Sequence, residues 1–98
     1  MTKFWQKKYK KNPNMVFRKI ADEVILVPIR NKVGDLQSIY TLNEVGARIW
    51  ELIDGKRELA KIKEILLEEF SVGVPRVEED LKAFVQKLER IEAVEEVK

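Results

Sequence analysis

The 98-residue chain is long enough for one small domain with a single core. It contains no Cys and no His, which excludes disulfides, thiolate or imidazole metal sites and the commonest catalytic base. Charged residues make up 37% of the chain, and no apolar run approaches the roughly 18 residues that a membrane span needs. We therefore expect a cytoplasmic protein without a membrane segment.

Charge is unevenly distributed along the chain. Residues 1–20 contain seven bases and no acid, whereas residues 21–98 contain 12 bases and 17 acids. We expect a basic, aromatic N-terminal arm at 1–14, ahead of a single domain at 15–98. Basic arms bind nucleic acid, anionic lipid or acidic peptides, but most are solvated termini. The three aromatic residues of this arm keep another interpretation open, in which it covers the sheet or contacts a second chain.

Three short strands are predicted after the arm, at 15–20, 24–29 and 36–42. Each is rich in residues that favour strands, and turn signals separate them. The short connections predict an antiparallel meander. The second strand is apolar on both faces, and helices can cover only one face of so small a sheet. The other face then requires the arm, a second subunit in a homodimer, or a partner protein.

Three helices complete the chain, at about 44–53, 59–70 and 75–91, where apolar residues recur at helical spacing. Asn43 can cap the first helix by accepting a bond from an orphan amide. Pro75 suits the first turn of the third. The predicted fold is α+β and winged helix-turn-helix-like, with a three-stranded antiparallel sheet followed by three helices.

Two residues of the first helix carry structural expectations. Gly46 lies inside the helix, where Gly costs about 1 kcal/mol relative to Ala, so we expect close packing against it. Trp50 is expected in the core. Gly55, just past the helix end, suits a left-handed backbone conformation.

Motifs for catalysis are missing from the sequence. Its two serines, Ser38 and Ser71, do not lie in a Gly-x-Ser-x-Gly elbow, and the four glycines do not form a phosphate-binding loop. Acidic runs such as 78–80 could bind a hard cation or supply an acid and a base, but solvated charge explains them better. We predict a protein that is not an enzyme and has no cofactor and no metal.

A DNA-binding winged helix is the alternative that the fold suggests. Its recognition helix would be the third, whose first turns should face bases and phosphates. Those turns carry Glu78, Glu79 and Asp80, opposed by Arg76 alone, and carboxylates work against binding to phosphates. We therefore do not expect nucleic acid as a partner, and keep a DNA-binding or protein-interaction module as the second hypothesis.

Three segments, LNEVGARIWELIDGKREL, IKEILLEEF and VEEDLKAFVQKLERIEAV, resemble the PqqD family, the peptide chaperones of pyrroloquinoline quinone biosynthesis and the related RiPP recognition elements. The resemblance covers about residues 17–94. Two features depart from the family pattern: Arg57-Glu58 replaces the Ser or Thr that often opens the second helix, and the arm has no counterpart. The matching positions are Leu42-Asn43, Ile49-Trp50, Asp54-Gly55, Asp80 and Phe84.

The resemblance implies a non-catalytic adaptor that holds the leader segment of a ribosomally synthesised precursor peptide. The partner would be a modifying enzyme, in this family often a radical S-adenosylmethionine protein. The leader would add as a strand to the third strand and lie against the third helix, which agrees with the physics of exposed strand edges.

The residues that this model assigns to peptide binding lie on two elements. Since a stripe this regular is mostly core, we expect only some of the helix residues to touch peptide. Asp80 could equally stabilise the helix end. The edge residues are Gln37, Ser38, Ile39, Tyr40, Thr41 and Leu42; those of the groove wall are Val77, Asp80, Leu81 and Phe84, with Val85 and Leu88 as further candidates.

Overall fold

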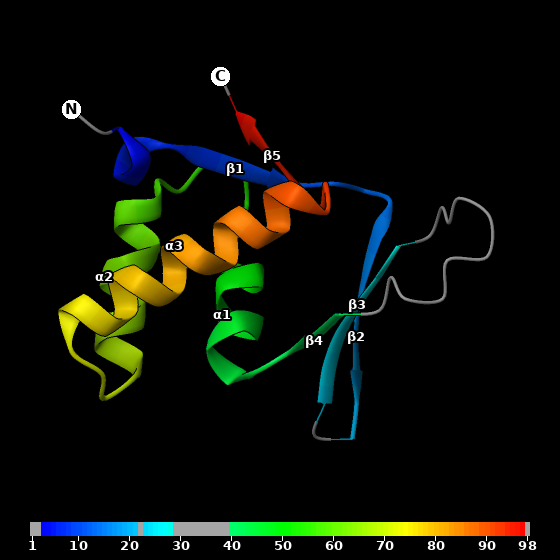
Figure 1. Cartoon of the computed structure of the whole chain (residues 1–98), viewed down its shortest axis with the longest axis horizontal. Coiled ribbons are helices and arrows are strands. Elements are labelled where there is room, and N and C mark those ends of the chain that lie inside the picture. The colour runs from blue at the N-terminus through cyan, green and yellow to red at the C-terminus, as the bar shows by residue number, and fades with distance from the viewer. Residues whose placement is uncertain (1–2, 22, 29–39, 98) are drawn as a thin grey trace.

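The computed structural model describes residues 3–21, 23–28 and 40–97. A short 3₁₀ helix and four strands precede three α-helices and a last strand (Figure 1). The elements in chain order are η1 (Phe4–Gln6), β1 (Lys8–Lys11), β2 (Met15–Ile20), β3 (Glu23–Pro28), β4 (Tyr40–Leu42), α1 (Glu44–Leu52), α2 (Leu59–Glu69), α3 (Val74–Arg90) and β5 (Val94–Val97).

Strands β2, β3 and β4 form the predicted antiparallel sheet in that order. Phe17 faces Leu26 across β2 and β3, and Leu26 in turn faces Tyr40 on β4. Leu26 is fully buried, so these three side chains lie on the face toward the helices. The first part of the predicted third strand, residues 36–39, lies outside the described residues. The α+β prediction, with a three-stranded sheet followed by three helices, is confirmed.

The opposite face of the sheet points away from the helices, because side chains alternate along a strand. Val16 and Val27 are paired across β2 and β3 on this face. Ile20, also on this face, is 57% exposed. The arm does not cover it among the described residues, since β1 pairs with β5 instead.

Local signals at the helix ends have the predicted roles. The Asn43 side chain accepts a hydrogen bond from the Gly46 amide at 2.8 Å and so caps α1. Gly55 takes a φ of 80° after this helix, where a side chain would strain the backbone. Glu58 makes no side-chain cap at the start of α2, which agrees with the departure from the family pattern there. Pro75 lies in the first turn of α3.

One hydrophobic core joins the sheet, the helices and the arm. In Figure 1, α3 crosses the other two helices, and the β2–β3 hairpin extends away from them. Trp50, predicted to be a core residue, is 3% exposed. The buried apolar residues are Tyr9, Leu26, Leu42, Ile49, Trp50, Leu52, Ile53, Leu59, Ile62, Leu66, Val77, Leu81, Val85, Leu88, Ala93 and Val94.

The N-terminal segment is part of the packed structure, so the expectation of a solvated tail is wrong for residues 4–11. Its β1 strand pairs antiparallel with β5 at the other end of the chain. Tyr9 is only 2% exposed, and its hydroxyl donates a hydrogen bond to Glu89 at 2.9 Å. The backbone of the same segment also accepts hydrogen bonds from the amides of Gly55 and Leu59. The aromatic residues therefore explain the arm better than its charge does.

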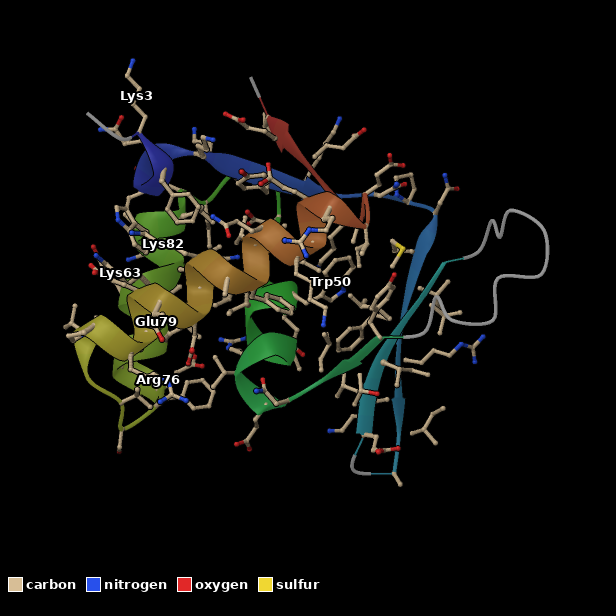
Figure 2. The ribbon with its side chains drawn as sticks, in the orientation of Figure 1. Lys3, Trp50, Lys63, Arg76, Glu79 and Lys82 are labelled. Atoms are coloured by element: carbon tan, nitrogen blue, oxygen red, sulfur yellow. The ribbon has the colours of Figure 1, made fainter. Side chains whose placement is uncertain are left out.

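Two of the arm's lysines lie near acids of the adjacent β5 strand. Lys7 and Lys10 lie 3.8 Å from Glu96 and Glu95 of the adjacent β5 strand. Trp5 of η1 lies under Lys63 of α2, whose Nζ is 4.5 Å from the ring centroid, so a cation–π contact adds to the packing. Figure 2 shows Lys63 and Lys82 on the side of the helices where η1 lies. Part of the basic charge of the N-terminal segment is therefore engaged in contacts within the molecule.

Among the described helices, none combines the length and the apolar character needed to cross a lipid bilayer.

Candidate functional site

Strand β4 is an edge strand of the described sheet. It pairs with β3 on one side, and no described strand pairs with its other side. Tyr40 is half-buried, Thr41 is exposed and Leu42 is 7% exposed. An edge strand presents backbone N–H and C=O groups that a further strand can satisfy. The other predicted edge residues, Gln37, Ser38 and Ile39, lie outside the described residues.

A cleft of about 290 Å³ opens between the first turns of α1 and one side of α3. It has an apolar base and polar or charged groups around it, the usual composition of a ligand-binding cleft. We call it the α1–α3 cleft. Its lining residues are Asn43, Val45, Gly46 and Ile49 from the α1 side and Arg76, Asp80, Ala83, Phe84 and Lys87 from α3.

Gly46 and Phe84 set the width of this cleft. A Cβ atom placed on Gly46 would lie 3.3 Å from Cε1 of the Phe84 ring and 3.2 Å from the Oδ1 atom of Asn43. These separations are shorter than ordinary van der Waals contacts, so a side chain at residue 46 would force Phe84 or the Asn43 side chain to shift by a few tenths of an ångström. The close packing that the sequence predicts at Gly46 is thus confirmed, and it forms the base of the cleft.

Two neighbouring stripes of α3 have different positions. Val77 and Leu81 are 4% and 0% exposed and do not line the α1–α3 cleft, so their contact with a peptide stays a prediction. Val85 and Leu88 are buried in the same way. A second stripe lies beside these buried residues, mostly one position before a buried one, and it faces the cleft. It consists of residues 76, 80, 83, 84 and 87. Of the four helix residues predicted for the site, Asp80 and Phe84 are brought to it.

Several lining residues are not among those predicted from the sequence, and two of them, Ala83 and Lys87, extend the stripe of Asp80 and Phe84. Their spacing from Asp80, three and seven residues, keeps them on one side of the helix. This helical spacing can be read from the sequence. The apolar stripe beside it is wider and more regular, however, and is therefore the stronger signal for a binding surface.

Charges occur at both ends of the cleft. Near the start of α3, Arg76 donates a hydrogen bond to Asp80 at 3.2 Å, which explains Asp80 without a ligand. Farther along the helix, the Nζ atom of Lys87 lies 5.7 Å from the centre of the Tyr40 ring on β4. This contact joins α3 to the edge strand, so β4 and the cleft are parts of one surface.

The described residues do not supply the parts of a metal site. No group of three or more Asp or Glu side chains among them could hold an ion. Glu78 forms an ion pair with Lys63 at 2.9 Å, and Glu79 stays exposed on α3. This helix therefore presents carboxylates where a helix that reads DNA would need Lys or Arg side chains.

An edge strand beside a cleft on the third helix is the arrangement that the family resemblance implies. Residues 23–94 match the family model described as Coenzyme PQQ synthesis protein D (PqqD). The chain belongs to the PqqD family. Strands β3 and β4, all three helices and the start of β5 fall within the match, whereas η1, β1 and β2 precede it.

One solved structure extends this comparison beyond the part that matches the PqqD model. It is described as TbiB1 in complex with the TbiA(beta) leader peptide, and it is 31% identical to this chain with a TM-score of 0.70. The alignment covers 88% of this chain and 94% of TbiB1. No curated protein matched the sequence.

Proposed function

We propose that this PqqD-family protein binds the leader segment of a ribosomally synthesised precursor peptide by strand addition to β4. The observation that carries the proposal is the free edge of β4 beside the α1–α3 cleft. The similarity to TbiB1, described in complex with a leader peptide, supports it. The alternative of a DNA-binding module is not favoured.

The physical basis is a division of roles between backbone and side chains. An added strand satisfies the edge N–H and C=O groups of β4 and gains affinity that depends little on sequence. Alternate side chains of the guest point toward the helices, where the cleft between Gly46 and Phe84 can select their size. Lys87, which also lines the cleft, adds selection for a negatively charged side chain of the guest.

The protein would act as a non-catalytic adaptor that presents the bound peptide to a separate enzyme. The family resemblance predicts that this enzyme is a radical S-adenosylmethionine protein. A homodimer also stays a prediction, and the open face of the sheet around Val16, Val27 and Ile20 is the surface that it would use.

The test begins with selection of binders from a displayed library of random 20-residue peptides. Chemical shifts of the ¹⁵N-labelled protein should then change on β4 and along the cleft-facing stripe of α3 when a selected peptide is added. Methylation of single backbone amides along the peptide should weaken binding at every second position of the paired segment, because only alternate amides face β4.

Two substitutions on α3 provide the matched comparison. Ala83 lines the cleft and is exposed, whereas Gln86 is exposed on the same helix but does not line it. Ala83→Glu should lower the affinity for the selected peptides at least about tenfold, because peptide binding would bury the new charge. Gln86→Glu should leave this affinity within about twofold of the wild-type value. Equal affinities of both variants, or shift changes confined to residues 3–14, would refute the groove model.

A further inference from the structure

A second, larger cleft lies on the other side of α1. Its volume is about 620 Å³, and it is bounded by the sheet face toward the helices, by α1 and by the end of α2. We call it the α1–sheet cleft. Its apolar lining consists of Phe17, Val24, Leu42, Ala47 and Phe70.

Most of this apolar lining is incompletely covered. Phe17, Val24, Ala47 and Phe70 are only half-buried, although Phe17 and Val24 project from the sheet face that is directed at the core. Burying such side chains stabilises a complex by about 25 cal/mol per Å² of apolar surface. An apolar side chain supplied by a ligand would complete this packing.

Lys19 gives the α1–sheet cleft a free positive charge. It lies on the same face of β2 as Phe17, two residues along the strand, and lines the cleft. It forms no ion pair with any other described residue. The other cation of the cleft, Arg48, is already held by Glu69 at 2.8 Å and by Glu51 at 3.2 Å. A ligand with a carboxylate near its apolar side chain would pair with Lys19.

The two clefts are connected around the beginning of α1. Asn43 lines both of them, and Figure 1 shows α1 between α3 and the β2–β3 hairpin, with β4 leading into its first turn. A helix with its side chains is about 10–12 Å wide. About six extended residues, at roughly 3.3 Å each, are enough to pass around half of its circumference.

The direction of the guest strand decides which end of the peptide reaches the second cleft. All described strand pairs of this sheet are antiparallel, and an antiparallel guest on β4 has its N-terminal end beside Leu42. Residues that precede the paired segment therefore leave the edge next to Asn43. Leu42 and Asn43 both line the α1–sheet cleft, so these preceding residues leave the edge strand beside it.

We propose that the α1–sheet cleft is a second subsite for the same peptide, which takes an apolar side chain and a neighbouring carboxylate from the residues that precede the paired segment. This inference rests on the proposed function, because it presupposes a guest strand on β4. It adds a second contact to that function, so that the segment recognised is longer than the strand alone.

The experiment compares the wild-type protein with two variants, Ala47→Glu and Ala83→Glu. In each variant, an alanine that lines one of the two clefts is replaced by glutamate. Peptides selected from the random library are shortened from the N-terminus up to the paired segment, and their affinities are measured by fluorescence anisotropy. Loss of the preceding residues should weaken binding to the wild type at least about tenfold, the change expected for one buried apolar side chain. Ala47→Glu, which fills the α1–sheet cleft, should bind long and short peptides equally.

Each outcome separates the two proposals. If long and short peptides bind the wild type equally while Ala83→Glu weakens both, the second subsite is refuted and the proposed function stands. If Ala83→Glu leaves both unchanged, the proposed function fails as well. Circular dichroism establishes that Ala47→Glu is folded.

Lys19→Glu provides a second variant that removes no apolar packing. Selection against the wild type should enrich Asp and Glu in the residues that precede the paired segment, and selection against Lys19→Glu should enrich Lys and Arg there. The same enrichment for both proteins would overturn the assignment of Lys19 to the subsite.

Discussion

At the scale of single residues, Gly46 and Phe84 mark a point where α1 and α3 pack closely against each other. Gly46 was identified from the sequence as an unfavourable helix residue that needed a packing reason, and Phe84 supplies it at 3.3 Å from the position of a Cβ. What the sequence did not indicate is that this contact forms the base of a cleft. The partner of Gly46 lies 38 residues away in the chain, and residue spacing carries no information about such a contact.

Gly46→Ala tests whether this contact controls binding. Ala gains about 1 kcal/mol of helix propensity over Gly, but the new Cβ displaces Phe84 and crowds the Asn43 cap, so we expect the free energy of unfolding to change by less than about 1 kcal/mol. Phe84 is half-buried and lines the cleft, so a shift of its ring should change the shape of the cleft and lower the affinity for selected peptides several-fold. Urea unfolding and fluorescence anisotropy measure the two quantities.

Gly73→Ala is the control for this substitution. Nothing lies closer than 3.8 Å to a Cβ at residue 73, and Gly73 does not line the cleft. Unchanged peptide affinity in both variants would show that the width of the cleft at Gly46 does not select the ligand.

The buried hydroxyl of Tyr9 should make the folded protein less stable in alkaline solution. Burial, reinforced by the hydrogen bond to Glu89, raises the pKa of its hydroxyl well above the usual value of 10. The folded state therefore favours the protonated phenol, and this contribution is present below about pH 10 and is lost as the pH rises above it. The melting temperature of the wild type should fall more steeply between pH 9.5 and 11.5, roughly, than that of Tyr9→Phe. Parallel curves for the two proteins would contradict this account.

At the scale of elements, periodicity predicted the helices and strands well but did not assign their faces. The β2 strand was predicted with the same bounds as observed, and each helix lies within two residues of its predicted range. On α3, however, the most regular stripe is core, and the neighbouring stripe of Asp80 and Phe84 faces the cleft. Both stripes have helical spacing, so only the positions of α1 and the sheet distinguish them.

The arm is the element whose prediction failed, and its removal should be costly. Deletion of residues 1–11 takes Tyr9 out of the core and removes the pairing with β5. Loss of one buried aromatic side chain costs about 3–5 kcal/mol, so urea unfolding should show destabilisation by at least about 3 kcal/mol. Tyr9→Ala should reproduce most of this loss. A truncated protein as stable as the wild type would show that the segment is a solvated tail after all.

At the scale of the whole molecule, charges that are separated in sequence lie side by side. The basic N-terminal strand pairs with an acidic C-terminal strand, which places Lys10 opposite Glu95. Lys7 likewise lies 3.8 Å from Glu96 of the same strand. Within the described residues, this pairing offsets part of the basic charge on which affinity for nucleic acid would depend.

Titration with duplex DNA tests this inference. We expect only weak binding at physiological salt, because few phosphates are neutralised. Binding at low salt should decline as salt is added, because the release of counterions from DNA then contributes less free energy. Fluorescence anisotropy with a labelled duplex of random sequence makes the measurement. Tight binding that persists at physiological salt would restore the DNA-binding hypothesis.

The sequence by itself determined the three α-helices, the antiparallel sheet of β2, β3 and β4, the cap of α1 and the family, but not η1 or β1. Hydrogen bonding and side-chain periodicity within a helix or strand are local, so Asn43, Gly55 and Pro75 specify their structures directly. Only the tertiary structure decided that the arm is part of the core, that Asp80 and Phe84 share a cleft from which Val77 and Leu81 are excluded, and that a second cleft lies behind α1. These features depend on contacts between residues far apart in the chain, which result from the packing of all the elements together.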